Sequence, residues 1–453
     1  MNSRQILTAI VAVIGLMTGF DAVGQETRKL SLSEAIQLSL QNSNQLKLQQ
    51  AKVTEATAAL REAKERRLPD LSITGSYMRL NKPTLDLKTQ SPQQGEGGGS
   101  TGGNSLSSIE VKQVGYGMAN LSLPVFAGFR IQNGIDAAKY LEKAAKLDAQ
   151  KDRADVIENT IAAYSNLYKA KEALDLVKEN LKQSQQRVAD FSNLEKNGLL
   201  ARNDLLKAQL QQSNVELALL DAENAWKLTN ISMNLMLGLA ENTDLVPDGA
   251  EFKSPNEVDG YTTWESKAME NRADIAASEM RIKAANSGVK AAKGEYYPSL
   301  ALTGGYIGAN IPDVLTLTNA LNAGVGVKYS PSSLWKTGSK VAQAKAQLQQ
   351  VKMGQNLLTD NVRLQTAQAY QNFLSSKKKI EVYAKAVEQA TENYRIVKNK
   401  HTNNLATTTD LLDADVAQLQ ARLNQAVAEA EAMVSYNKLL QTAGVLTPEI
   451  TNK

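Results

Sequence analysis

Long stretches without proline dominate the pattern of apolar and polar positions along this chain. No proline occurs between Val125 and Val246 or between Ser332 and Thr447, although the chain has ten. The interior of a helix excludes proline, so these stretches predict long helices. At 1.5 Å per residue, the two longest would extend about 90 Å. We expect helices over residues 32–67, 131–192, 203–238, 264–295, 338–398 and 409–443.

The two longest predicted helices carry a regular apolar stripe. Apolar or small residues recur there at alternating spacings of three and four, and heptads sustained in this way predict coiled-coil packing of helix on helix. The stripe consists of Leu167, Ala170, Leu174, Val177, Leu181, Ser184, Val188 and Phe191 in the first helix, and of Phe373, Ser376, Ile380, Tyr383, Val387, Ala390, Tyr394 and Val397 in the second.

Four shorter segments between the helices are rich in glycine and alternate weakly in polarity. They predict strands over 71–80, 108–123, 300–309 and 320–329. Each is near the ~9 to 11 residues that a tilted strand needs to cross a bilayer. After the N-terminal region no stretch is apolar for about 18 residues, so we expect any membrane contact to be made by strands.

Four strands cannot close, and lipid does not tolerate an open sheet edge, so the protein must oligomerise. Three copies would give twelve strands and two copies eight, and the strand pattern does not choose between them. Phe126, Phe129 and Trp335, where strands lead into the long helices, suit a bilayer interface; ordinary packing at a strand–helix corner explains each of them equally well. A glycine-rich loop over 90–104 joins the first two strands.

The chain contains an internal duplication. Residues 42–83 align without a gap with 271–312 at an offset of 229, which pairs Asn42 with Asn271. A second register, at an offset of 206, pairs Gly238 with Gly444. The repeat is far longer than that of a solenoid. We therefore expect two halves of similar design, 25–241 and 263–453, joined by a linker over 242–262.

Residues 1–24 have the pattern of a secretory signal. Arg4 precedes an apolar run over 6–16, and Ala22-Val23-Gly24 ends the segment. A retained N-terminal anchor is the alternative, although the apolar run is short for a bilayer span. Aromatic residues make up only 5% of the chain, which is the composition of long helices rather than of a thick core.

Composition argues against several classes of function. The formal net charge of +4 is a balance that argues against a nucleic-acid binder, which normally concentrates basic residues on one face. The chain has no cysteine, one histidine, no phosphate-cradling glycine loop and no cluster of metal ligands, so we expect no enzyme, no cofactor and no metal site. A periplasmic coiled-coil scaffold or adhesin would account for the helices, but not for two glycine-rich hairpins at equivalent places.

Taken in order, the signal, helix, hairpin, long helix, turn and helix, repeated once, resemble the TolC family of outer-membrane efflux proteins. The resemblance covers essentially the whole chain after the signal. It rests on short motifs in a shared order: the helix ending at Leu68-Pro69-Asp70-Leu71, Val125-Phe126-Ala127-Gly128 ahead of the first long helix, Asn197-Gly198-Leu199 in the first turn and Asp410-Leu411-Leu412-Asp413 after the second.

The resemblance implies a mainly helical homotrimer, with twelve strands in one outer-membrane β-barrel and the helices continuing into a periplasmic α-helical barrel. The chain would be the passive channel subunit of a tripartite efflux or type I secretion system in a Gram-negative bacterium. Its partners would be a periplasmic adaptor, an inner-membrane pump and outer-membrane lipid, without nucleic acid. Whether the cargo is a drug, a metal or a polypeptide does not follow from the chain.

The resemblance also assigns the two helix-to-helix turns, 193–203 and 399–409, to the periplasmic tip. Gly198, with Asn197 and Leu199, would receive the hairpin tips of the adaptor. A glycine between two helices also supplies the left-handed conformation that ends the first, and the two roles are compatible. In the second turn asparagine, the next best residue for this conformation, replaces the glycine: the equivalent residues are Asn403, Asn404 and Leu405.

Asp410 and Asp413 match the paired gate aspartates of the family, and Asp204 and His401 complete our set of gate candidates. Carboxylates of three copies around a narrow pore would raise some of their pKa values and favour cations. Alternatively, Asp410 caps its helix, as Asp204 would in the first repeat. His401 and Ala406 stand where the family has a latch tyrosine and arginine, so the latch would differ. A lone histidine at a turn is usually solvated, with pH sensing as the other hypothesis.

Overall fold

The order of helices and strands repeats once along the chain, with the two repeats beginning at α2 and α6. The computed structural model describes residues 27–81, 83–85, 109–249, 259–312 and 315–447, so the expected signal, the loop over 90–104 and part of the linker lie outside the described residues. The helices are α2 (Leu32–Asn42), α3 (Asn44–Glu65), α4 (Arg130–Lys196), α5 (Arg202–Leu237), α6 (Tyr261–Asn271), α7 (Ala273–Lys293), α8 (Ser333–Thr402) and α9 (Thr408–Thr442). The strands are β1 (Thr27–Leu30), β2 (Asp70–Arg79), β3 (Thr84–Leu85), β4 (Ile109–Glu110), β5 (Gln113–Ala127), β6 (Asp244–Pro247), β7 (Ser299–Ile311) and β8 (Leu315–Lys328).

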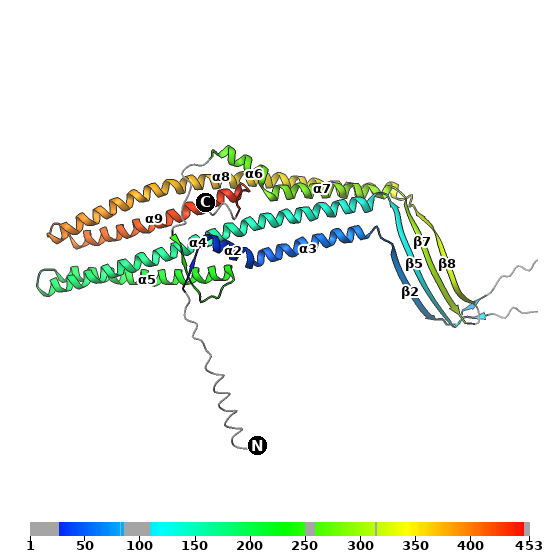
Figure 1. Ribbon diagram of the computed structural model, residues 1–453, viewed down its shortest axis with the longest axis horizontal. Helices are drawn as coiled ribbons and strands as arrows, with labels where there is room; N and C mark the ends of the chain where they lie inside the picture. The colour runs from blue at the N-terminus through cyan, green and yellow to red at the C-terminus, as the bar shows by residue number, and fades with distance from the viewer. Residues whose placement is uncertain (1–26, 82, 86–108, 250–258, 313–314, 448–453) are drawn as a thin grey trace, which may run out of the picture. The chain divides into compact units, whose positions relative to one another are not determined.

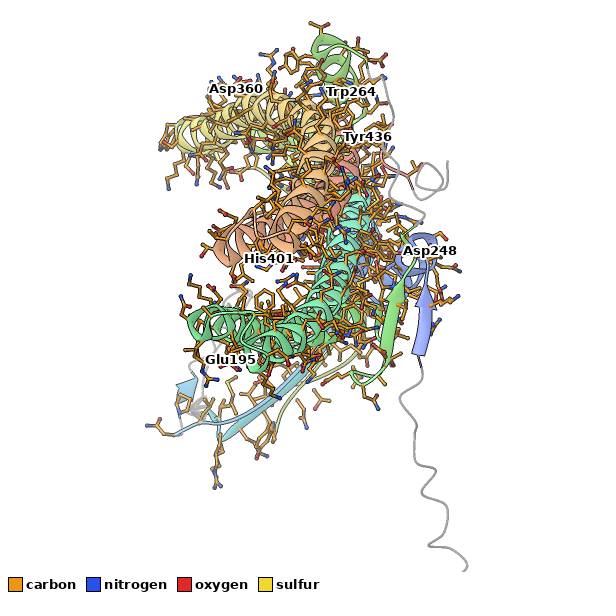
Figure 2. The ribbon with its side chains drawn as sticks, turned by 90° about the vertical axis from the view of Figure 1, so that its left-hand side faces the viewer. Glu195, Asp248, Trp264, Asp360, His401 and Tyr436 are labelled. Atoms are coloured by element: carbon orange, nitrogen blue, oxygen red, sulfur yellow. The ribbon has the colours of Figure 1, made fainter. Side chains whose placement is uncertain are left out.

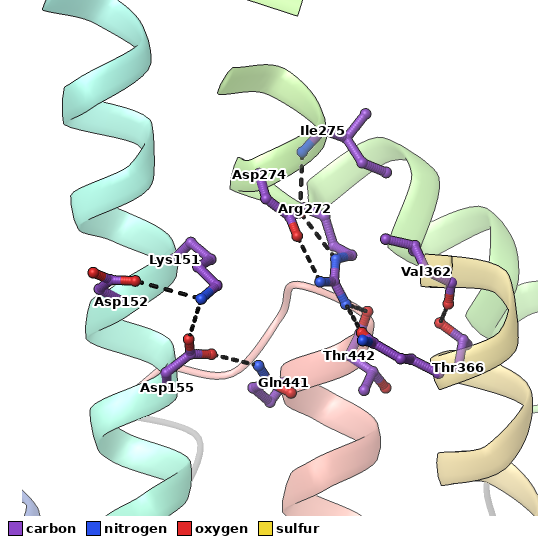
Figure 3. Close-up of polar contacts among 11 residues, drawn as sticks. Lys151, Asp152, Asp155, Arg272, Asp274, Ile275, Val362, Thr366, Gln441 and Thr442 are labelled. Carbon is purple, nitrogen blue, oxygen red and sulfur yellow. Dashed lines mark hydrogen bonds and ion pairs between the residues drawn. The ribbon is translucent and has the colours of Figure 1, made fainter. Parts of the chain in front are cut away.

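The expected helices over 32–67 and 264–295 are each broken into two. The chain leaves the helical conformation at Ser43 and Arg272, whose ψ angles are 117° and 122°. The Ser43 hydroxyl accepts a hydrogen bond from the Leu46 amide at 3.3 Å and so caps the new helix. Arg272 is held by tertiary contacts, with its guanidinium donating to both carboxylate oxygens of Asp274 and to the Thr442 carbonyl (Figure 3). Neither break has a proline or glycine that the sequence pattern could reveal.

The chain divides into two compact units, each built from both repeats. The first comprises Met1–Ala51, Leu147–Ala276 and Asn356–Lys453. The second comprises Lys52–Lys146 and Ala277–Gln355. Helices α3, α4, α7 and α8 contribute to both units.

An antiparallel sheet with the strand order β2-β5-β7-β8 lies in the second unit (Figure 1). Its strands differ from those expected at their ends. β5 runs over Gln113–Ala127 rather than 108–123, and β8 begins at Leu315 rather than at residue 320, because pairing of Leu315 with Ile311 continues the ladder. Cross-strand pairing, which the alternation of single strands does not contain, therefore sets the strand lengths.

The two faces of this sheet differ in polarity. Paired residues of antiparallel strands share a face, so the register places Ser72, Asn120, Gly305 and Asn322 together on one face. The opposite face is almost entirely apolar along all four strands: Leu71, Ile73, Ala119, Leu121, Leu302, Tyr306, Leu321 and Val325.

The core of the first unit is helical, with Tyr164 and Phe373 among its largest fully buried side chains. The Tyr164 hydroxyl donates to the Leu30 carbonyl of β1 at 2.9 Å. β1 pairs in parallel with β6, so the linker over 242–262 contains a strand that the sequence analysis did not predict. Strands of four residues are too short for a recognisable alternation.

Both long helices bury the predicted stripe, since every one of its positions is buried or half-buried. Among the described helices, none combines the length and the apolar character needed to cross a membrane.

The duplication reappears as two equivalent contacts in the first unit. Gly238 and Gly444, which end α5 and follow α9, have positive φ angles of 71° and 72°. A side chain added at Gly238 would meet Asn42 at 3.0 Å, and one added at Gly444 would meet the carbonyl carbon of Asn271 at 2.8 Å. Residues that the two sequence registers pair are therefore close in space in both repeats, Gly238 to the Asn42 side chain and Gly444 to the Asn271 backbone.

Candidate functional site

The two helix-to-helix turns of the first unit have the same backbone structure. Gly198 and Asn404 adopt left-handed conformations, with φ of 72° and 60°, as their sequence positions predict. Leu199 donates its amide to the Leu194 carbonyl at 2.9 Å, and Leu405 donates to Lys400 at 2.8 Å. Figure 2 looks onto this end, with Glu195 near the end of α4 and His401 near the end of α8.

A groove of about 1260 Å³ runs between the α4/α5 and α8/α9 hairpins. Four of the sequence candidates line it: Leu199, Asp204, His401 and Asn404. Asn197, Gly198, Asn403, Leu405, Asp410 and Asp413 do not line it. Leu199 and Leu405 are exposed apolar side chains at the turns, and the amides of Asn197 and Asn403 donate to backbone carbonyls one helical turn earlier. The groove therefore has the exposed Leu199 at its end, and both polar and apolar side chains line its length.

His401 is not the solvated side chain that its position at a turn suggested. Its ring is half-buried and stacks on Phe191 of α4, with centroids 5.5 Å apart and planes inclined by 18°. Its Nε2 lies 3.3 Å from the Thr408 hydroxyl at the start of α9. The single histidine thus connects α4, α8 and α9.

Asp410 forms a capping box with Thr407. The Thr407 hydroxyl accepts from the Asp410 amide at 3.1 Å, and the Asp410 carboxylate accepts from the Thr407 amide at 2.9 Å. The hydrogen bonds from Thr407 also hold the pKa of Asp410 below its ordinary value. Asp410 therefore stabilises the first turn of α9 from the third helical position, whereas Asp413 is exposed.

Asp204 occupies the equivalent position on α5 but makes no capping box, because Ala201 stands where the second repeat has Thr407. Its carboxylate lies 3.5 Å from the Lys207 ammonium. Lys207 in turn donates to the Thr409 hydroxyl at 3.3 Å. Asp204 thus takes part in a polar contact between the two hairpins.

Sequence reasoning missed a buried ion pair next to the groove, in which only the arginine lines the groove. Arg187 of α4 lies 3.0 Å from the carboxylate of Asp415 on α9, and the two side chains are only 8% and 3% exposed. Burial by itself opposes the charged form, but Asp415 outweighs it, so the pKa of Arg187 is raised. The predicted stripe passes through Val188, one residue away. The available signal was the continuation of Leu174 and Val177 through Asn180, Ser184 and Arg187 at spacings of three and four.

The expected interface aromatics lie at the end of the sheet where its strands join helices. Phe126 and Phe129 make an edge-to-face contact with centroids 5.2 Å apart, and Phe129 packs in the same way on Tyr297 at 6.3 Å. Trp335, near the start of α8, is exposed. All three candidates thus lie next to one rim of the sheet.

Within the described ranges, no group of three or more histidine, cysteine, aspartate or glutamate side chains has the arrangement of a metal site. The site consists of a groove, two turns and a buried ion pair, an arrangement suited to binding and to movement of helices.

Comparison with known sequences assigns a family. A sequence profile of the outer membrane efflux protein family matches residues 35–239 and 264–445. The chain is 23% identical over 449 residues to the outer membrane efflux protein BepC of Brucella suis biovar 1, covering 97% of this chain and 91% of that protein. It is 24% identical over 256 residues to the toxin and drug export protein A of Aggregatibacter actinomycetemcomitans, covering 52% of this chain and 50% of that protein.

The fold is similar to that of the outer membrane protein VceC from Vibrio cholerae. The TM-score is 0.72 at 19% identity, covering 91% of this chain and 96% of that chain. The resemblance drawn from the motifs is confirmed by the profile, which spans most of the chain. The chain therefore belongs to the outer membrane efflux protein family, and its place in the cell is the outer membrane of a Gram-negative bacterium.

Proposed function

We propose that this chain is the channel subunit of an efflux or secretion system. Three copies would form one twelve-stranded barrel in the outer membrane, and their helices would enclose a periplasmic duct through which cargo leaves without chemical change. The observation that carries the proposal is the two-faced sheet of the second unit.

The apolar face of the sheet has the character of a lipid-facing surface. Ile73 on β2 is 80% exposed and Leu321 on β8 is 81% exposed in the single chain. Large apolar patches are uncommon on monomers in water, and an apolar outer face with a polar inner face is the pattern of a membrane barrel. Phe126, Phe129 and Trp335 lie where the rim of such a barrel would meet the headgroups.

The edges of the sheet favour a ring of copies. β2 and β8 are its edge strands and run in opposite directions. Antiparallel pairing of β8 from one copy with β2 of the next would satisfy both edges, as lipid requires. Eight strands leave an interior that side chains fill, whereas a duct needs a wider barrel. Three copies therefore suit the function better than two.

The helices supply a second reason for association. α5 exposes Leu206, Leu210 and Leu217, whereas the repeat equivalents of the first and last, Leu412 and Leu423 on α9, are buried and half-buried. One chain thus covers two of these three positions in its second repeat and none in its first, whereas Val416, the repeat equivalent of Leu210, stays exposed. A neighbouring copy would cover the leucines of α5.

The two helix-to-helix turns are the surface at which we expect partner proteins to bind. A periplasmic adaptor would dock at the two turns and the groove between them, and an inner-membrane pump would deliver the cargo. Efflux of small molecules and secretion of a polypeptide would use the same passive duct, so the pump would select the cargo.

A planar bilayer tests the proposal. The purified protein is expected to give stable single-channel steps, and subunit counting by native mass spectrometry is expected to give three copies. A folded protein that stays monomeric in detergent at micromolar concentration, without conductance, would instead favour a coiled-coil scaffold.

A further inference from the structure

A polar stretch interrupts the apolar packing of α4 against the second hairpin. The buried positions of α4 continue from Leu174 and Val177 to Asn180, Ser184 and Arg187 before Phe191 restores an apolar contact. Arg187 lies nine residues before the end of α4 at Lys196, about 14 Å along the helix. The interruption is therefore close to the tip, where helices would move if the duct opens.

Two of the polar side chains of this stretch, those of Asn180 and Arg187, meet at the carboxylate of Asp415. Asp415 accepts from Arg187 at 3.0 Å and from the Asn180 amide at 3.4 Å. The second amino group of the guanidinium donates to the Tyr394 hydroxyl of α8 at 3.3 Å. The set joins α4 of the first repeat to α8 and α9 of the second.

The physics of a buried ion pair suits a contact that must separate. A buried pair adds little stability compared with an apolar contact of the same size, because both charges lose their hydration. When the two helices part in water, both charges regain it, whereas separated leucines would be exposed at full cost. Such a pair also penalises alternative registers that leave one charge buried alone.

The groove gives water a route to the arginine of the pair. Arg187 and Tyr394 both line the groove between the hairpins. Because the groove is open to solvent at the tip, a small separation of the hairpins would admit water to the guanidinium first.

The duplication shows that this contact is specific to one seam. The repeat equivalents of Arg187 and Asp415 are Asn393 on α8 and Gln209 on α5, and both are uncharged and exposed. An equivalent ion pair therefore cannot form between α8 and α5, whether in one chain or across two copies. The buried ion pair between α4 and α9 therefore has no counterpart at the equivalent positions of α8 and α5.

We propose that the Arg187–Asp415 pair is a latch that holds the two helical hairpins of each chain together in the closed duct and separates when the duct opens. The inference rests on the proposed channel function. It assigns the closing role to residues other than His401 and Asp410. His401 already stacks on Phe191, and Asp410 already forms a capping box with Thr407.

The test measures two quantities, the distance between the two helix-to-helix turns and the open fraction of single channels. Spin labels are attached to cysteines introduced by Asn197→Cys and Asn403→Cys, one on each turn. Because the chain has no cysteine of its own, the labels react only at these two positions. In the assembled protein, Arg187→Ala is expected to add a longer distance between the turns and to raise the open fraction of single channels about tenfold or more, because the remaining buried charge favours the separated state. The charge exchange Arg187→Asp/Asp415→Arg is expected to return both values toward wild type.

Arg395→Ala is the matched control. Arg395 is one residue from Tyr394 and pairs with Glu392 at 2.6 Å, but both side chains are exposed. The latch is refuted if Arg187→Ala has the distance distribution and open fraction of Arg395→Ala.

A second variant keeps the test decisive if Arg187→Ala does not fold. Arg187→Leu/Asp415→Leu removes both charges and makes the seam apolar, so it is expected to assemble, keep the short distance and conduct less than wild type. Wild-type conductance from this variant would overturn the latch. If no variant, including wild type, conducts, the channel proposal fails, while the distances still decide whether the pair holds the hairpins together.

Discussion

The backbones of Gly128 and Gly294 lie so close that neither residue has room for a side chain. A Cβ at Gly128 would overlap the Gly294 carbonyl oxygen, and one at Gly294 would overlap the Gly128 carbonyl oxygen. This contact joins the end of β5 to the turn after α7. It fixes how the sheet of the second unit meets the helix that precedes β7.

Gly128→Ala is expected to destabilise the second unit by at least about 2 kcal/mol, because it combines a left-handed φ of 61° with a clash against backbone. Thermal unfolding of the assembled protein measures the loss. Gly134→Ala is the control, since Gly134 lies in α4 with no atom near the added methyl group, and alanine favours helix by about 0.5–1 kcal/mol. Equal effects of the two substitutions would contradict the close contact.

Substitutions of Gly198 by asparagine and by tryptophan are expected to have different effects on efflux. Asn404 has the same left-handed conformation in the second turn, and nothing lies within 4 Å of a Cβ added at Gly198. Gly198→Asn should therefore keep the turn, the assembly and efflux. Gly198→Trp should keep the assembly but abolish efflux, because its indole would block the adaptor.

Drug efflux by cells, together with the yield of assembled protein in the outer membrane, measures both outcomes. Asn404→Trp provides the matched change at the other turn. Efflux that survives Gly198→Trp would remove the first turn from the docking site.

The two gate candidates are expected to respond differently to loss of charge. Asp413 is exposed and makes no capping contact, so Asp413→Asn should weaken the cation preference of single channels measured under a salt gradient. Asp410→Asn should instead lower the thermal stability of α9, because the Asp410 carboxylate accepts from Thr407. A cation preference unchanged by Asp413→Asn would exclude Asp413 from the pore lining.

Asp274 predicts a pH dependence of stability in the first unit. Burial alone would raise its pKa, but the two hydrogen bonds from Arg272 and the local backbone amides lower it below the ordinary value. A carboxyl whose pKa is lower in the folded state stabilises it above the unfolded pKa, and this contribution is lost as the pH falls through the folded pKa. Wild type should thus exceed Asp274→Asn in stability at neutral pH.

The difference between the two melting temperatures should shrink as the pH is lowered from 7 toward 3. Glu392→Gln serves as the control, since its partner Arg395 is exposed and surface pairs contribute little. A difference that stays constant across this range would mean that Asp274 acts through packing rather than through its charge.

Local features of the chain were predictable because they depend on residues close together in sequence. The absence of proline marks the long helices, the spacing of apolar residues marks their packing stripes, and glycine or asparagine marks the left-handed turns at Gly198 and Asn404. The duplication also foretold which residues are equivalent, since Gly238 lies close to Asn42 and Gly444 lies close to Asn271.

The sequence by itself thus determined the helices, the four main strands, the two turns and the repeat, since propensity and periodicity act over a few residues. Only the tertiary structure decided the break at Arg272, the β1–β6 pair, the order of the sheet and the ion pair of Arg187 with Asp415. The partners in these contacts are far apart along the chain. The sequence around an arginine in a helix does not show whether its side chain is exposed to solvent or pairs with a buried carboxylate.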